Sequence, residues 1–202
     1  MRSLVLGALI AAAAGLCGAA LSHSDGWYNA VIARFNSKPE GQPAGNLSSP
    51  AIAGYGFAHY EPDAAFQPDA GLSNKVVFKV SSGAQDTSVT NPALEKVAST
   101  VNLYVAAGVP ANKLKFVVAV NGEATPAMLD NMHYKKLYGV NNPNLPLIAA
   151  LELQGIKVTV CDQALAWHHY QREWIAKRVI HTLSALTTIS TLQNQGYAFV
   201  SI

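Results

Sequence analysis

The sequence predicts an α/β domain, a three-layer sandwich in which helices cover both faces of a mostly parallel, five-stranded sheet. Three observations predict this fold. From residue 74 onward, short apolar runs alternate with longer segments of helical periodicity. The run at 114–120 is apolar nearly throughout, as a strand covered on both sides would be. Half of the 202 residues are apolar, which is enough for one sizeable core.

The five strands are expected where apolar runs stand between turn and stop signals. Gly108 and Pro110 end the segment before the second run, and Asn121-Gly122 follows that run. Gly155 precedes the third run. Because the runs alternate with helical segments, right-handed crossovers should make the sheet parallel. The expected strands are residues 75–80, 114–120, 157–160, 178–182 and 197–202.

Helices are expected between the strands, because apolar residues recur there with a period near 3.6. Leu94, Val97 and Val101 share one face of the first helix. Trp167, Tyr170 and Trp174 stand at i, i+3 and i+7, which predicts a helical stripe in the core or in a subunit interface. The expected helices are residues 91–107, a segment starting near 125–126, 146–154, most of 162–176, and 184–195.

The first 22 residues differ from the rest and read as a secretory signal peptide. Arg2 supplies a positive charge, residues 4–16 form an alanine-rich apolar run, and small residues follow at the spacing of a signal-peptidase site. The run is short for a bilayer crossing. We therefore expect export to the periplasm and no stable membrane span after cleavage of residues 1–22. An uncleaved N-terminal anchor is the alternative.

Residues 23–73 are expected to form an N-terminal helix and an extended arm. Apolar residues recur every four positions within 25–36, which predicts a short amphipathic helix. Residues 37–73 are rich in Gly, Pro, Ser and Ala and show no period. Aromatic residues such as Tyr55 and Phe66 argue against disorder there. We expect them to pin the arm onto the domain or onto a neighbouring subunit.

Composition and motifs disfavour several functions. Only 13% of residues are charged, the formal net charge is +2, and Lys and Arg are scattered, so no nucleic acid partner is expected. The sequence has no phosphate-binding glycine loop and no serine-hydrolase elbow. His168 and His169 would point about 100° apart on a helix, so they cannot easily share one ion. We expect no metal site and no cofactor.

The candidate site centres on Cys161, at the junction between the third strand and the following helix. Once Cys17 leaves with the signal peptide, Cys161 is the only thiol. Ligands of open α/β sheets gather at the carboxyl ends of the strands, where turns are expected at 81–83, 121–122 and 161–163. We therefore predict Cys161 as the catalytic residue and Asn121, Gly122, Asp162 and Gln163 as substrate-binding residues. The other reading of Cys161 is a small buried hydrophobe.

The ordered segments of residues 74–202 resemble the DsrE/DsrF-like sulfur-relay family, including its exported members. The matching segments are KVVFKVSS from residue 75, VNLYVAAGVPANKLKFVVAV at 101–120, NPNLPLIAALELQGIKVTVCDQAL at 142–165 and SALTTISTLQNQGYAFVSI at 184–202. GYGFAHYEPDAAFQPDA at 54–70 looks like the lead-in of exported relatives. The resemblance implies a flavodoxin-like domain over 74–202 that assembles into homo-oligomers, often trimers or hexamers.

The resemblance also implies that Cys161 carries sulfane sulfur as a persulfide, in a sulfurtransferase-type exchange with a sulfur donor or acceptor protein. Two neighbours depart from the family pattern. Many relatives have His-Gly where this chain has Asn121-Gly122, and many have Gly where it has Asp162. The first change removes a general base, and a carboxylate beside a thiol disfavours the thiolate. The alternative function is therefore a non-catalytic homo-oligomeric binding module of the same fold with a structural cysteine.

Overall fold

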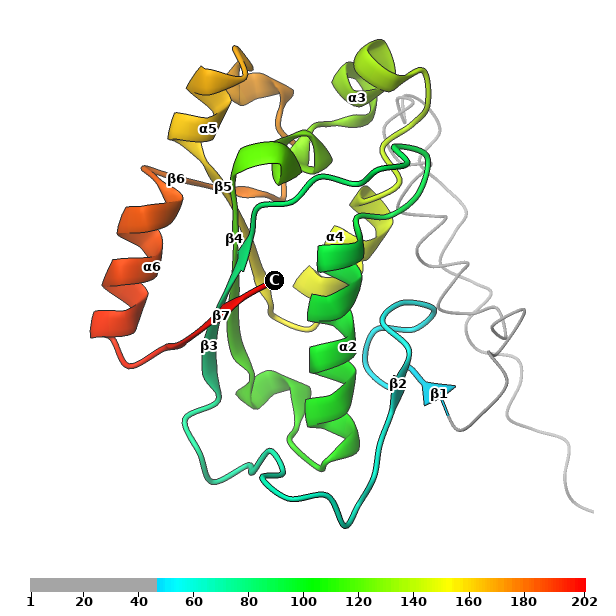
Figure 1. The fold of residues 1–202 in the computed structure, drawn as a ribbon, viewed down its shortest axis with the longest axis vertical. Coiled ribbons are helices and arrows are strands. Elements are labelled where there is room, and N and C mark those ends of the chain that lie inside the picture. The colour runs from blue at the N-terminus through cyan, green and yellow to red at the C-terminus, as the bar shows by residue number, and fades with distance from the viewer. Residues whose placement is uncertain (1–46) are drawn as a thin grey trace, which may run out of the picture.

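The computed structural model of the chain describes residues 47–202 (Figure 1). The expected signal peptide at 1–22, the expected helix within 25–36 and the first part of the arm lie outside the described residues. From residue 75 onward the chain follows the alternation of strands and helices that the sequence predicts.

The core of the fold is a five-stranded sheet in the order β6-β5-β4-β3-β7. All four strand pairs are parallel, which confirms the predicted mostly parallel sheet. Each strand lies within or next to the run that the sequence assigns to it. The strands are β3 (Lys75–Val80), β4 (Lys115–Val120), β5 (Lys157–Cys161), β6 (Ile180–Thr182) and β7 (Ala198–Ser201).

Helices cover both faces of the sheet, as predicted (Figure 1). The larger core lies between the sheet and the helices α2 (Pro92–Ala106) and α4 (Leu145–Leu153), which bury Leu94 and Leu147 against Phe78. On the opposite face, α6 (Ala185–Asn194) packs Ile189 against Val77 and its neighbours in β4. The alternation of side chains along each strand separates these two cores.

The segment after β5 differs from the predicted helix over most of 162–176. The helix α5 (Asp162–Trp167) has only six residues, a left-handed residue follows at His169, and η3 (Arg172–Trp174) is a 3₁₀ turn. Residues 174–176 instead exchange backbone hydrogen bonds with residues 128–130. This tertiary pairing outweighs the local periodicity. The predicted continuous helix under the aromatic stripe is therefore wrong. Tyr170 and Trp174 pack against the core as expected, whereas Trp167 is 83% exposed and its place in a subunit interface stays a prediction.

The helix expected near residues 125–126 is the 3₁₀ helix η2 (Gly122–Met128), and the separate helix α3 (Asn131–Tyr138) follows it. Asp130 caps α3 by accepting a hydrogen bond from the His133 N–H, and Gly139 ends it in the left-handed conformation. Both end signals stand in the sequence, although the prediction did not separate α3 from the segment before it.

The described part of the arm packs on the domain through its first residues. β1 (Leu47–Ser48) and β2 (Ala58–His59) form a small antiparallel pair, and the loop between them buries Ile52 and Tyr55. Tyr55 thus fulfils the expectation that aromatic residues pin the arm onto the domain. Phe66 is fully exposed and does not contact the domain, so its contact with a neighbouring subunit stays a prediction.

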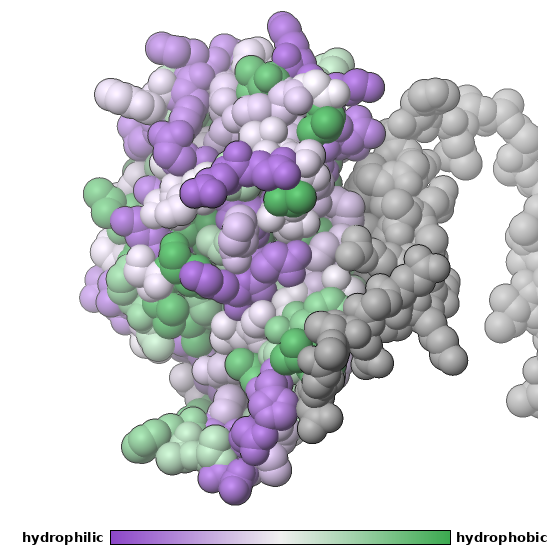
Figure 2. Space-filling view, turned by 45° about the vertical axis from the view of Figure 1, so that its right-hand side comes forward, coloured by the Kyte–Doolittle hydropathy of each residue, from purple (hydrophilic) through white to green (hydrophobic). Residues whose placement is uncertain are grey.

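Figure 2 shows how hydrophobic residues are distributed over one face of the molecule. On the face shown in Figure 2, hydrophobic residues lie in separate groups between hydrophilic ones. Within residues 47–202, every helix is too short or too polar to cross a bilayer.

Candidate functional site

Cys161 is the last residue of β5 and the N-cap of α5. Its Sγ accepts a hydrogen bond from the Ala164 N–H at 3.4 Å, and the residue is 6% exposed. It is the free cysteine of the described part of the chain. The strand-to-helix junction predicted for Cys161 is therefore present, with the thiol buried in its own helix cap.

Asn121 lies beside Cys161 at the carboxyl edge of the sheet. Val120 of β4 is in register with Val160 of β5, so the next residues along the two strands are Asn121 and Cys161. Asn121 keeps an extended backbone, so its side chain continues the alternation and shares the sheet face of Cys161. Among the described residues, the buried Asn121 Oδ1 has no hydrogen-bond partner. Such an atom is costly unless something binds it.

Asp162 is held by two basic side chains that the sequence analysis did not connect with it. Arg172 Nη1 donates to its Oδ2 at 2.8 Å, and His181 Nδ1 lies 2.7 Å from its Oδ1. Arg172 is mostly exposed, so its ion pair is screened by water. The two partners nevertheless face the carboxylate oxygens. Asp162 therefore opposes a thiolate at Cys161 less than the sequence alone indicates.

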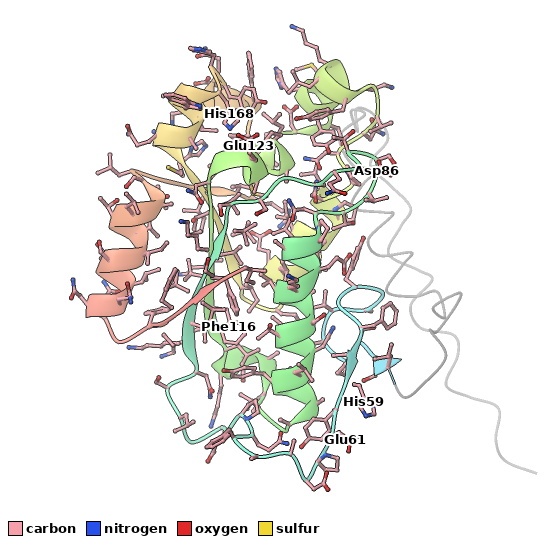
Figure 3. All side chains as sticks on the ribbon, in the orientation of Figure 1. His59, Glu61, Asp86, Phe116, Glu123 and His168 are labelled. Carbon is pink, nitrogen blue, oxygen red and sulfur yellow. The ribbon has the colours of Figure 1, made fainter. Side chains whose placement is uncertain are left out.

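Gln163 and Gly122 also lie near the carboxyl edge of the sheet, and each makes a contact with a distant part of the chain. Gln163 is exposed and its Nε2 donates to Leu183 O at 3.3 Å, at the start of the connection to α6. His168 Nε2 lies 3.0 Å from Gly122 O, so the chain after α5 reaches back to η2. Figure 3 shows His168 and Glu123 at the same end of the molecule. This contact joins residues 46 positions apart, and no signal in the sequence predicts it.

A cavity of about 390 Å³ opens at the same edge of the sheet. It is lined by the loop after β3 and by η2, α3 and the start of α4, and none of the five predicted site residues lines it. The expected turn at 81–83 contributes Gly83 to this cavity. The structure thus brings the turns at 121–122 and 161–163 together in the Cys161 site. The turn at 81–83 contributes to the cavity instead.

Within residues 47–202, the His, Cys, Asp and Glu side chains form no group of three or more that could hold a metal ion.

The chain is similar to a protein family and, at low sequence identity, to solved structures. The family described as "DsrE/DsrF-like family" matches residues 74–202. A protein of unknown function from Methanobacterium thermoautotrophicum, MTH1491, is 16% identical, with a TM-score of 0.46 over 63% of this chain and 97% of its own. The YchN protein from E. coli is 15% identical, with a TM-score of 0.44 over 63% of this chain and 98% of its own. No functionally curated protein matches the chain.

Proposed function

The chain belongs to the DsrE/DsrF-like family, and from this premise we propose that it is a sulfur-relay-type protein that carries sulfane sulfur as a persulfide on Cys161. The observation that carries the proposal is the position of Cys161 at the carboxyl end of β5, where the neighbouring strand β4 leads into Asn121 with its unpartnered amide oxygen. This edge is where open α/β sheets bind their ligands.

The proposed reaction is a thiolate exchange. The Cys161 thiolate attacks the outer sulfur of a donor persulfide, R–S–SH. The S–S bond of the donor breaks, the donor leaves as the thiolate R–S⁻, and a new S–S bond joins Cys161 to the transferred sulfur. An acceptor thiolate then attacks that sulfur and returns Cys161 to the thiolate, so neither step needs an external oxidant.

The surroundings of Cys161 support this exchange in two ways. The added sulfur stands about 2 Å beyond Sγ, along a bond of ordinary disulfide length. On the same face, the unpartnered Asn121 Oδ1 can accept a hydrogen bond from the S–H of the protonated persulfide. The Arg172 cation offsets the charge of Asp162, which would otherwise disfavour a second anion next to it, and His181 Nδ1 lies within hydrogen-bond distance of the same carboxylate.

The proposal includes the compartment, the oligomeric state and the partner of the protein. The signal-peptide pattern at 1–22 supports delivery to the periplasm, and the family resemblance supports a homo-oligomer, a trimer or a hexamer. A sulfur donor or acceptor protein would then meet the carboxyl edge of the sheet.

The first prediction concerns the mass of the protein. Incubation of the mature chain with glutathione persulfide should add the mass of one sulfur atom, which intact-mass spectrometry detects. The adduct should disappear with dithiothreitol and should not form on Cys161→Ser. A folded sample whose Cys161 reacts with a maleimide but never gains sulfur would refute the carrier function.

A specific observation favours the second candidate function, a non-catalytic homo-oligomeric binding module with a structural cysteine. Cys161 is buried, and its Sγ is already engaged with the Ala164 N–H. Such a thiol behaves as a small hydrophobe with a capping role.

Thiol accessibility separates the two functions. For the carrier, we expect the native protein to react with a small maleimide within minutes, because sulfur exchange requires an approach to Sγ. If the cysteine is structural, the maleimide should react with Cys161 only after denaturation. The Cys161→Ser variant should then keep the fold and the oligomer. Asn121→Ala is the matched variant, because it removes the neighbouring amide and keeps the thiol.

A further inference from the structure

The cavity at the carboxyl edge of the sheet is separate from the Cys161 site. It lies between the loop 81–91, η2, α3 and the start of α4, on the side of the sheet covered by α2 and α4. Its volume of about 390 Å³ falls within the range of small-molecule sites. The side chains that give it chemical character are Gln85, Asn91, Glu123, Tyr134, Tyr138 and Asn144.

The charge in this cavity is negative. Among the described residues that line it, Glu123 is the only one with a charged side chain, and none of them is Lys, Arg or His. Asp86 stands between two lining residues of the loop, and its carboxylate accepts hydrogen bonds from the Ser88 N–H and Oγ at 2.8 and 2.6 Å. Figure 3 shows Asp86 and Glu123 at the same end of the molecule. A ligand that enters this cavity therefore meets the Glu123 carboxylate. His168, whose Nε2 lies 3.0 Å from the O of the preceding Gly122, is not among the lining residues.

Two tyrosine rings form the aromatic wall of the cavity. The rings of Tyr134 and Tyr138 lie 4.7 Å apart between centroids and are tilted by 52°. Tyr134 Oη donates to Thr87 O at 2.8 Å, which fixes that ring against the loop. Burial raises the pKa of Tyr134 to about 12, and burial and the nearby charge of Glu123 raise the pKa of Tyr138. Both phenols therefore stay neutral at physiological pH.

The walls are fixed before any ligand binds. The Asn91 N–H donates to Asn144 Oδ1 at 2.7 Å, and Asn91 Nδ2 donates to Ser82 O at 2.9 Å. Gly83 lets the loop approach η2 closely, because a Cβ at this position would stand 2.8 Å from Glu123 O. A site of this kind loses little conformational entropy on binding.

We propose that this cavity binds a small organic cation, with an ammonium group against the Glu123 carboxylate and its alkyl part against the rings of Tyr134 and Tyr138. Carboxylate and aromatic faces together are the groups that recognise ammonium ions in proteins. The amide of Gln85 offers a neutral hydrogen-bonding group for a polar tail such as a hydroxyl.

Choline is the probe for this proposal, and its neutral carbon analogue 3,3-dimethylbutan-1-ol is the control ligand. Titration of the ¹⁵N-labelled mature protein, followed by NMR, should show saturable shifts with choline at residues 83–87 and 123–138. The neutral analogue should bind at least about tenfold more weakly, because it lacks the charge that meets Glu123. Equal affinity for the two ligands, or no saturable shift with choline, would overturn the proposal.

Three single substitutions test whether choline binds at Glu123. Glu123 is exposed, so Glu123→Gln should leave the fold intact and weaken choline binding by about tenfold or more. Glu173→Gln changes an equally exposed carboxylate that does not line the cavity and should bind choline like the parent protein. Unchanged binding by Glu123→Gln would refute the proposal. Cys161→Ser should also bind normally, so the failure of this proposal and of the sulfur-carrier function are distinguishable.

Discussion

Replacement of Asn102 by alanine is expected to release residues 47–57 from the domain while the parallel sheet stays folded. Asn102 is fully buried in the middle of α2. Its Oδ1 accepts hydrogen bonds from the Ala51 and Ile52 N–H groups, both at 2.9 Å. Its Nδ2 donates to Tyr55 O at 3.0 Å and to Gly56 O at 2.9 Å. One side chain therefore satisfies four backbone groups of the arm.

The expected size of the effect follows from those four groups. Each buried polar group left without a partner costs about 1–3 kcal/mol, so the docked arm, with four such groups, would lose at least about 4 kcal/mol. Residues 47–57 escape this cost by detaching into water, which limits the loss to their own docking free energy. Hydrogen exchange should therefore accelerate at residues 51–56 and remain slow in β3, β4 and β5.

The matched control is Lys96→Ala, which removes an exposed side chain from the same helix and should leave exchange at residues 51–56 unchanged. Equal protection of those residues in Asn102→Ala and Lys96→Ala would contradict the prediction. So would a loss of protection in the central strands equal to that in the arm, because the arm would then be inseparable from the core.

Gly56 tests the same contact from the side of the arm. Its backbone has φ +55°, and a Cβ there would stand 2.2 Å from the Ser99 N and 2.4 Å from the Ala98 carbonyl carbon. Its N–H donates to Glu95 Oε2 at 2.7 Å. Gly56→Ala cannot fit without moving the loop away from α2, and it should release the same residues as Asn102→Ala. If either variant also weakens an oligomer, the arm contacts a neighbouring subunit as well as its own domain.

Local signals made most of the fold predictable from the sequence. The strands were indicated by apolar runs, and α2 by Leu94, Val97 and Val101 at helical spacing. The end of α5 was not predictable, because residues 174–176 leave the helical pattern to pair with 128–130, which lie far away in the sequence. A polar Asn102 inside an apolar helix was the available signal for the arm contact, since asparagine lowers helix propensity and needs partners when buried.

The candidate site was predictable in its position and not in its electrostatics. The order of strands and turns was enough to place Asn121 and Cys161 at one edge, because parallel strands end together. The partners of Asp162 stand 10 and 19 residues further along the chain, with no periodicity that links them to it. Such pairs depend on how β6 and η3 return to the end of β5, which only the folded chain determines.

Replacement of Asn142 by alanine is expected to destabilise the whole domain. Asn142 is buried before α4, and its Nδ2 donates to Ala127 O at 2.9 Å and to Leu129 O at 2.6 Å. Its Oδ1 accepts hydrogen bonds from Asn144 N and Asn144 Nδ2 at 3.0 and 2.9 Å. Unlike the arm, this segment has no route to water that spares the core, because Leu129 and its neighbours are fully buried.

We therefore expect Asn142→Ala to lower the free energy of unfolding by about 3–5 kcal/mol, since several buried groups lose their partners at once. The melting temperature should fall by roughly 10 °C, as measured by circular dichroism. Asn142→Asp keeps the side-chain volume and places a carboxylate against two carbonyl oxygens, so it should be at least as destabilising. Asn141→Ala is the control, because the neighbouring Asn141 is exposed.

The same asparagine network connects stability with the cavity. Asn144, which Asn142 orients, lines the cavity and also accepts the hydrogen bond from the Asn91 N–H. Asn142→Ala should therefore weaken choline binding even at temperatures where the domain stays folded, whereas Asn141→Ala should not. A variant that melts earlier and still binds choline like the parent protein would show that the walls do not depend on this network. Loss of both properties together would mean that the side chains that hold α2 and α4 at the sheet edge also shape the cavity.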